Sequence, residues 1–221
     1  VVYPFTVVAL ALALLIGDGC AALLSLSLGK GDRETGSRCI GNGIFFTVLI
    51  GIVLTILGFA LEDSILALFG VTDGCYAYAK DYMDIILLGI PFYVFASAMN
   101  GPIRADGAPG YAMFATVIGA ILNLIGDPVA IFVLDLGVKG AAAATVIGQV
   151  VSCLVTLAYF RRPKLFRLAK ADFRPRMRLL GQTCRLSVCS LITQLSIVII
   201  MSVANNLVGL YGPQSVHGAD I

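Results

Sequence analysis

A carboxylate and an amide lie four residues apart inside a long apolar run, a spacing that could bind an ion. Asn123 precedes Asp127 within the run 111–134, and residues four apart lie above one another on a helix. Pro128 follows directly and has no N–H for the carbonyl of Leu124, so we expect the helix to bend and free that carbonyl. A carboxylate, an amide and a carbonyl would then converge on a site that suits a proton or a small hard cation such as Na⁺.

Acidic side chains inside apolar segments are costly, and each is therefore a functional-site hypothesis. Asp127 is the expensive choice where Asn or Ser would hydrogen-bond as well, so we favour a cation-coupling role for it. The alternative is that Asp127 is a helix-packing residue hydrogen-bonded to Asn123. A second acid, Asp18 in I-G-D-G-C, fits the wall of a polar cavity as well as it fits a second coupling site.

The following apolar segment, 140–160, offers a partner surface to the Asp127 helix. Small residues recur along it every four positions: Gly140, Ala144 and Gly148. Such a stripe lets two helices approach closely in lipid. Thr145 and Gln149 lie beside the stripe and are also four residues apart. The sequence therefore predicts one polar cluster between two closely packed helices, made of Asn123, Asp127, Thr145 and Gln149.

The elements that carry these residues are predicted to be membrane-spanning helices of an all-α polytopic protein. Of the 221 residues, 59% are hydrophobic and 13% are charged, and the mean hydropathy is +0.96, far more apolar than a soluble domain. About 20 apolar residues span a bilayer. Six such spans are predicted: 1–28, 40–61, 82–99, 111–134, 140–160 and 182–210. Pro91, in the third span, is expected to bend its helix as Pro128 does.

Lysine and arginine are distributed very unevenly between alternate loops. The loops 29–39, 100–110 and 161–181 hold twelve of the fifteen basic residues, whereas the opposite side holds only Lys80 and Lys139. The positive-inside rule therefore places these three loops in the cytoplasm, with the chain spanning the inner (plasma) membrane several times. We interpret the basic loop 161–181 as an inner-face linker between two lobes, with a patch for nucleic acid or anionic lipid as the alternative.

Several enzyme signatures are absent from the sequence, so we do not expect an enzyme. The segment Gly29-Lys-Gly-Asp32 does not have the spacing of a phosphate-binding loop, and neither an H-E-x-x-H motif nor a Cys/His metal cluster is present. A net charge of +2 is too small to indicate nucleic acid. We therefore expect no cofactor beyond a coupling ion, no nucleic-acid partner and no obligate protein partner. The expected partner from composition is the lipid bilayer.

Four motifs, in this order, resemble the MATE family of multidrug and toxic compound extrusion transporters, most closely the bacterial branch with the DinF-like proteins. They are L-G-K-G-D-R-E-T at 28–35, N-G-P-I-R-A-D-G at 100–107, G-A-I-L-N-L-I-G-D-P at 119–128 and G-V-K-G-A-A-A-A-T-V-I-G-Q at 137–149. The resemblance implies a twelve-helix antiporter of two lobes, of which this chain is a fragment covering about the second to the seventh helix. Residues 1–160 would be most of the first lobe, 161–181 the cytoplasmic linker and 182–221 the start of the second lobe.

The resemblance also implies a function. In similar proteins, an acid on the fifth helix, an Asn four residues before it and a Thr on the sixth helix are implicated in proton or sodium coupling, and they correspond to Asp127, Asn123 and Thr145. The implied activity is export of cationic or amphipathic organic compounds in exchange for H⁺ or Na⁺ by alternating access. The nearest alternative is a flippase for lipid-linked precursors with a related two-lobe architecture. A membrane-embedded transferase is an alternative of another class, and it would need clustered acids for Mg²⁺.

Overall fold

Every regular element in the described part of the chain is a helix. The computed structural model describes residues 3–62, 73–161, 163–166, 172 and 175–217. The elements are α1 (Tyr3–Gly29), α2 (Arg33–Ala60), α4 (Asp73–Ala105), α5 (Pro109–Pro128), the π-helix η1 (Val129–Val133), α6 (Gly137–Tyr159), α7 (Met177–Leu186) and α8 (Val188–His217). Five segments are long and apolar enough to cross a membrane: Phe5–Gly29, Arg33–Ala60, Ala79–Ala105, Pro109–Val133 and Gly137–Tyr159. The predicted all-α polytopic fold is confirmed.

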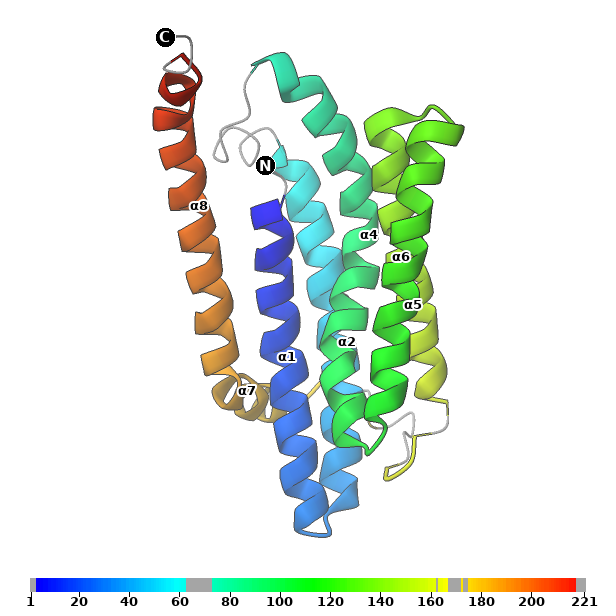
Figure 1. Cartoon of the computed structure of the whole chain (residues 1–221). Coiled ribbons are helices and arrows are strands. Elements are labelled where there is room, and N and C mark those ends of the chain that lie inside the picture. Colours follow the sequence, from blue (N-terminus) through cyan, green and yellow to red (C-terminus); the bar gives the residue numbers. More distant parts are fainter. Residues whose placement is uncertain (1–2, 63–72, 162, 167–171, 173–174, 218–221) are drawn as a thin grey trace.

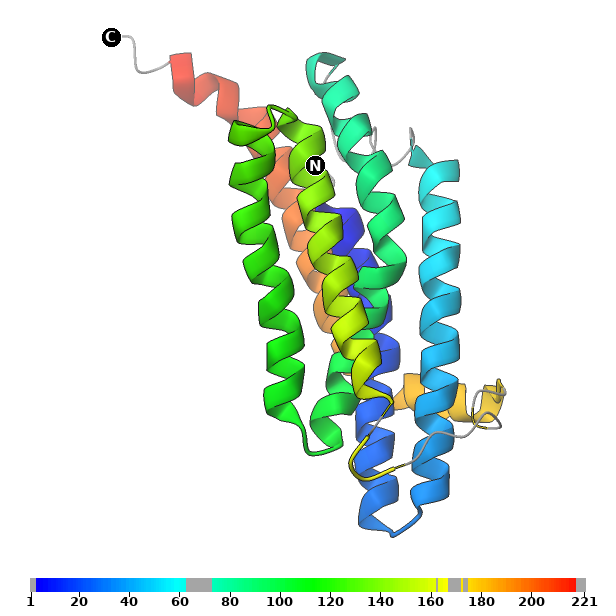
Figure 2. The same ribbon diagram turned by 90° about the vertical axis from the view of Figure 1, so that its right-hand side faces the viewer.

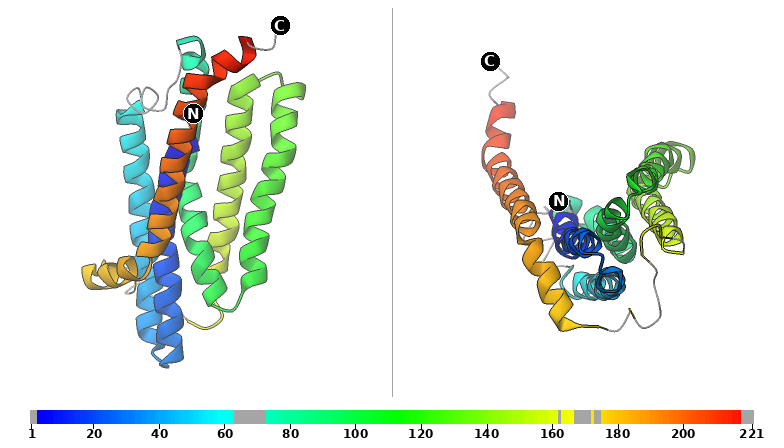
Figure 3. Two further views of the ribbon diagram at one scale, coloured as in Figure 1. Left: turned by 60° about the vertical axis from the view of Figure 1, so that its left-hand side comes forward. Right: turned by 90° about the horizontal axis from the view of Figure 1, so that it is seen from below.

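Helix α4 is at the centre of the bundle. It packs against α1, α2, α5 and α6, and Figure 1 shows these helices running side by side. Large, fully buried side chains come from α1, α2 and α4 and include Ile16, Leu24, Ile40, Met83, Leu87 and Ile90. Helix α8 stands beside α1 and diverges from it toward the C-terminus, and from below α8 and the α5–α6 pair lie on opposite sides of α1 (Figure 3). The core of the fold is therefore the α1–α2–α4 contact.

The described parts of the three basic loops lie at one end of the bundle. The α1–α2 turn, the α4–α5 turn and the end of α6 meet at the lower end in Figure 1. The loops are shorter than predicted, because α2 already begins at Arg33 and α7 at Met177. Residues 162, 167–171, 173 and 174 of the predicted linker lie outside the described residues, as do 63–72 at the opposite end.

The sixth predicted span, 182–210, is divided into two helices. Helices α7 and α8 meet at an angle of 61° and form a sixth crossing only if the bent pair is taken together. At the break, the Ser187 hydroxyl donates to the carbonyl of Thr183 at 3.0 Å, and the amide of Ser187 bonds to Cys184 instead of continuing the regular ladder. Figure 3 shows α7 lying across the direction of the bundle. No Pro or Gly marks this break, so the apolar pattern alone runs straight through it.

Two prolines inside α4 free carbonyls at its contacts with neighbouring helices. Pro91 has no N–H for the carbonyl of Leu87, and the Thr55 hydroxyl of α2 donates to that carbonyl at 3.2 Å. Pro102 likewise frees the carbonyl of Ala98, where α1 comes so close that a Cβ on Gly17 would lie 2.2 Å from the oxygen. Helix α4 nevertheless continues unbroken through both prolines. The prolines therefore serve helix packing, and the bend at Pro91 stays a prediction.

Candidate functional site

Helices α5 and α6 pack along the predicted seam of small residues, and Figure 2 shows them side by side. A Cβ on Gly148 would lie 2.8 Å from the carbonyl oxygen of Gly119, and one on Gly126 would lie 3.0 Å from the Cβ of Ala144. Larger side chains at these positions would force the two helices apart. This close contact brings the polar side chains of α5 within reach of those of α6.

Three of the four predicted polar residues form one hydrogen-bonded cluster. The Asn123 amide donates to Asp127 Oδ1 at 3.1 Å and to Thr145 Oγ1 at 2.9 Å. The Thr145 hydroxyl in turn donates to the carbonyl of Ala141 at 3.0 Å. All three side chains are half-buried. Asn123 thus uses both amide hydrogens, and the second carboxylate oxygen of Asp127 is available to a proton or another ligand.

The fourth predicted residue, Gln149, lies apart from this network. Its Oε1 atom is buried and has no hydrogen-bond partner among the described residues. It packs against α4, where a Cβ on Gly89 would lie 2.3 Å from that oxygen. Gln149 therefore belongs to the α4–α6 contact and not to the Asp127 cluster.

Helix α4 supplies a residue that sequence reasoning missed. Tyr82 interacts with the side chain of Thr145 and lies within electrostatic range of Asp127. The apolar pattern of the third span does not show which face of that span meets α6, so no sequence signal singled out Tyr82. With Tyr82, the cluster draws on three helices. Among the described residues, no three His, Cys, Asp or Glu side chains gather as they would for a metal centre, so the chemistry is that of one carboxylate among neutral polar groups.

A cavity of about 410 Å³ adjoins the cluster. It lies between α1, α4, α5 and α6, and Asn123 and Thr145 belong both to its wall and to the cluster. Other polar groups in the wall are Tyr93, Ser97, Asn100, Arg104, Thr116, Gln149, Ser152 and Thr156. Leu10 and Leu14 of α1 add an apolar side. The cavity can therefore take an amphipathic molecule, and Arg104 is a cationic side chain in its wall.

Asp18 is directed elsewhere. Its Oδ2 atom accepts a hydrogen bond of 2.8 Å from the Ser190 hydroxyl of α8. Asp18 is not in the wall of the 410 Å³ cavity. The prediction that Asp18 lines a polar cavity is therefore not met by this cavity. Whether Asp18 takes part in coupling stays a prediction.

The helix pattern changes directly after Pro128. Five residues of π-helix follow, and the amide of Leu134 donates to the carbonyl of Val129 at 3.0 Å, one residue further back than in an α-helix. Asp135, with a positive φ of 52°, ends the segment. Short π segments are often found at functional sites. The bend predicted at Pro128 stays a prediction, but the irregular backbone begins at Val129, two residues after Asp127.

A bundle of apolar helices around a polar cavity, with a carboxylate beside it, is typical of a membrane transporter. The MatE family model matches residues 1–129, more than half of the chain, and the chain therefore belongs to the MatE (MATE) family. This is a family of transporters and not of enzymes.

Known proteins show the same relationship. The chain is 28% identical to "Multidrug export protein MepA" of Staphylococcus aureus over 159 residues. This alignment covers 72% of the chain and 35% of MepA. The chain superposes on an inward-facing multidrug resistance MATE transporter with a TM-score of 0.85 at 29% identity. The superposition covers 91% of this chain and 46% of the transporter. An outward-facing MATE transporter gives a TM-score of 0.82 at 29% identity, with 90% and 45% coverage. The chain thus spans about a third of MepA and under half of the solved transporters.

Proposed function

We propose that the chain forms part of a secondary active antiporter, in which Asp127, Asn123 and Thr145 couple the inward movement of H⁺ or Na⁺ to the export of organic compounds. The observation that carries this proposal is the hydrogen-bonded cluster, in which Asn123 joins Asp127 to Thr145 across the α5–α6 seam. A carboxylate within an apolar span needs such partners, and it is a natural place to take up and release a cation.

The geometry defines how a cation would change the cluster. A proton on Asp127 removes the negative charge that the Asn123 amide stabilises, and so weakens a charge-assisted hydrogen bond. A sodium ion would instead need oxygen ligands, which Asp127, Thr145 and a turned Asn123 amide can supply. Either event alters the contact between α5 and α6 at the residue before Pro128. The cluster can therefore convert ion binding into a change of helix contact.

Transport by alternating access requires that the ion bind one conformation better than the other. Relatives at 29% identity are known in inward-facing and in outward-facing conformations, and both superpose on this chain. We further propose that residues 1–160 belong to one lobe, 161–181 to the linker and 182–221 to the second lobe. In that arrangement the ion at Asp127 shifts the population of the two conformations.

The proposed cargo is a cationic or amphipathic organic compound held in the 410 Å³ cavity. The mixed wall of apolar and polar side chains fits amphipathic molecules, and MepA is named a multidrug export protein. Arg104 in the cavity wall favours a second candidate, in which the cargo carries an anionic group, as it would in a lipid-linked precursor flippase. If the second candidate is right, Arg104→Gln should weaken export of carboxylate-bearing compounds. If the cargo is cationic, Arg104→Gln should leave export of the cationic compounds unchanged.

We place the chain in the plasma membrane, with the loops 29–39, 100–110 and 161–181 in the cytoplasm. Their location at one end of the bundle and the excess of basic residues in them support this orientation.

Dye transport into inverted membrane vesicles that contain the full-length protein tests the proposal. Uptake of a fluorescent organic cation should depend on an imposed H⁺ or Na⁺ gradient and stop when an ionophore collapses it. Uptake that continues unchanged after collapse of both gradients would show that the protein is not a secondary antiporter. A membrane-embedded transferase would likewise show no response to the gradient.

A further inference from the structure

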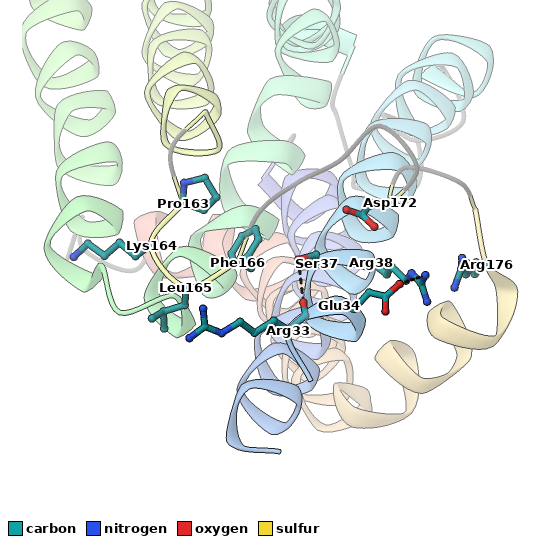
Figure 4. Close-up of a pocket in the computed structure, with 10 residues that line it drawn as sticks. All are labelled: Arg33, Glu34, Ser37, Arg38, Pro163, Lys164, Leu165, Phe166, Asp172 and Arg176. Atoms are coloured by element: carbon teal, nitrogen blue, oxygen red, sulfur yellow. Dashed lines mark hydrogen bonds and ion pairs between the residues drawn. The ribbon is translucent and has the colours of Figure 1, made fainter. Parts of the chain in front are cut away.

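A second cavity, of about 680 Å³, lies at the end of the bundle with the α1–α2 turn, away from the Asp127 cluster (Figure 4). Its walls come from the first turns of α2 and from the chain between α6 and α7. Six charged side chains line it: Arg33, Glu34, Arg38, Lys164, Asp172 and Arg176. We call it the basic cavity, because four cationic side chains face two acidic ones.

The two acidic side chains do not balance the positive charge of the basic cavity. Glu34 forms an ion pair with Arg38 one helical turn further on, and the Lys164 ammonium donates to the carbonyl of Gly107 at 3.1 Å. In Figure 4, Arg33 extends toward the segment with Leu165, and Arg38 extends toward Arg176. Four cations against two carboxylates leave two positive charges to be balanced, so the cavity should attract an anion.

Hydrogen bonds fix both sides of the basic cavity. The Asn42 side chain accepts from the amide of Arg176 at 2.9 Å and donates to its carbonyl at 3.2 Å. On the other side, Asp106 accepts from the amides of Lys164 and Leu165 at 2.7 and 2.8 Å. The linker is thus held against the bundle at residues 164–165 and again at Arg176. The basic side chains are carried on fixed backbone and not on a free loop.

The basic cavity lies beyond the end of the exposed apolar face of α2. Along α2, exposed apolar side chains begin at Phe45 and continue on the same face through Leu49, Ile52 and Ile56, with exposed fractions of 39, 44, 47 and 62%. This face of the protein would contact acyl chains. Arg38 precedes Phe45 by seven residues, or roughly 10 Å along the helix. The headgroup region on one side of the hydrocarbon core is roughly 5–8 Å thick, so the long Arg38 side chain can reach it.

We propose that the basic cavity binds the phosphodiester headgroup of an anionic phospholipid from the surrounding leaflet. Phosphate oxygens match the planar donors that the arginines of the basic cavity carry, and the acyl chains would lie against the apolar face of α2. The same phosphate chemistry occurs in soluble anions, but those would not gain the contact with that face. This inference does not depend on what the transporter carries. It gives the anionic-lipid alternative for the basic linker a defined site.

Lipid binding to the purified full-length protein tests this assignment. Thermal stability in detergent should rise with added phosphatidylglycerol, and should rise much less with phosphatidylcholine or with water-soluble glycerol phosphate. No selective effect of phosphatidylglycerol on the unmodified protein would overturn the proposal, whatever the variants do. Equal stabilisation by glycerol phosphate would show that the cavity binds a soluble phosphate and not a lipid headgroup, which would contradict the proposal.

Paired variants locate the site. Arg33→Gln with Arg176→Gln should weaken retention of phosphatidylglycerol in native mass spectrometry by about fivefold for each charge removed. Arg161→Gln with Arg178→Gln, at exposed positions on the same end, removes equal charge outside the cavity and should leave retention unchanged. Arg33→Lys with Arg176→Lys keeps the charge and should restore most of the retention. Equal loss in the Arg161/Arg178 pair would show general attraction to the surface instead of a site.

Discussion

The Asp18 carboxylate of α1 accepts a hydrogen bond of 2.8 Å from the Ser190 hydroxyl of α8, across 172 residues of sequence. Both neighbours of Asp18 are glycines at close helix contacts. Gly17 touches the carbonyl of Ala98 on α4, and a Cβ on Gly19 would lie 2.1 Å from the carbonyl of Thr183 on α7. Asp18 therefore lies where α1 meets α4, α7 and α8, and its hydrogen bond joins α1 to the helix proposed to open the second lobe.

Ser190→Ala should destabilise the protein, because it leaves a half-buried carboxylate without this donor. The expected loss is about 1–3 kcal/mol, seen as a lower melting temperature of the purified full-length protein. In an Asp18→Asn background the same change should cost less, since the amide is neutral. Ser196→Ala is the control, because the Ser196 hydroxyl only bonds within α8, to the carbonyl of Ile192. Equal effects of Ser190→Ala and Ser196→Ala would show that the hydrogen bond between Asp18 and Ser190 does not stabilise the protein.

Asp106→Asn should loosen the linker where it leaves α6. The Asp106 side chain is 0% exposed and accepts from the Tyr159 hydroxyl at 2.5 Å as well as from the amides of Lys164 and Leu165. An amide cannot accept all three bonds, so about 1–3 kcal/mol should be lost, and trypsin should cleave faster after Lys164. Tyr159→Phe removes one donor and should have the smaller effect. Unchanged cleavage in Asp106→Asn would show that the carboxylate does not hold the linker.

Gly17→Ala should impair folding, whereas Gly29→Ala on the same helix should not. A Cβ at position 17 would meet the backbone of Ala98 at 2.2 Å, while at position 29 nothing lies within 4 Å. Overpacking of this kind costs about 1–3 kcal/mol and occasionally more. The yield of monodisperse full-length protein measures the effect. Normal yield and stability of Gly17→Ala would mean that α1 and α4 do not touch there.

The start of α2 should be sensitive to acid. Asp32 caps this helix by accepting from the amide of Thr35 at 3.0 Å, and the hydrogen bonds from Thr35 lower the pKa of the Asp32 carboxyl. A lowered folded-state pKa means that the cap is fully effective above the unfolded-state pKa, about 4, and is lost as pH falls through the folded-state value. Asp32→Ala should speed amide exchange in the first turn of α2. In Asp32→Asn the capping should persist, but its pH dependence should disappear.

The sequence predicted the parts of the site that lie along one helix or one repeated pattern. Asn123 and Asp127 four residues apart, and the stripe from Gly140 to Gly148, were sufficient to predict the three-residue cluster with Thr145. Gln149 was predicted in the same cluster, and it shares a cavity wall with Asn123 and Thr145. Its Oε1 atom has no hydrogen-bond partner among the described residues, because spacing predicts a helix face but not which contacts each residue on that face makes.

Relationships between distant segments could not be predicted. Tyr82 meets Thr145, and Ser190 meets Asp18, only through tertiary packing, which leaves no trace in a local pattern. The break at Ser187 was missed for a different reason. A serine that bonds back to its own helix ends α7, and this signal is much weaker than a proline or a glycine.

The most direct test of the proposed coupling role is gradient-driven dye export by Asp127→Asn in the full-length protein, compared with Asp135→Asn. Asp135 lies just beyond η1 on the same helical span and at an exposed position, and Asn tolerates its positive φ. We expect Asp127→Asn to abolish export driven by an H⁺ or Na⁺ gradient while the protein still folds, and Asp135→Asn to retain it. Full gradient-driven export by Asp127→Asn would contradict the assignment of Asp127 as the coupling residue.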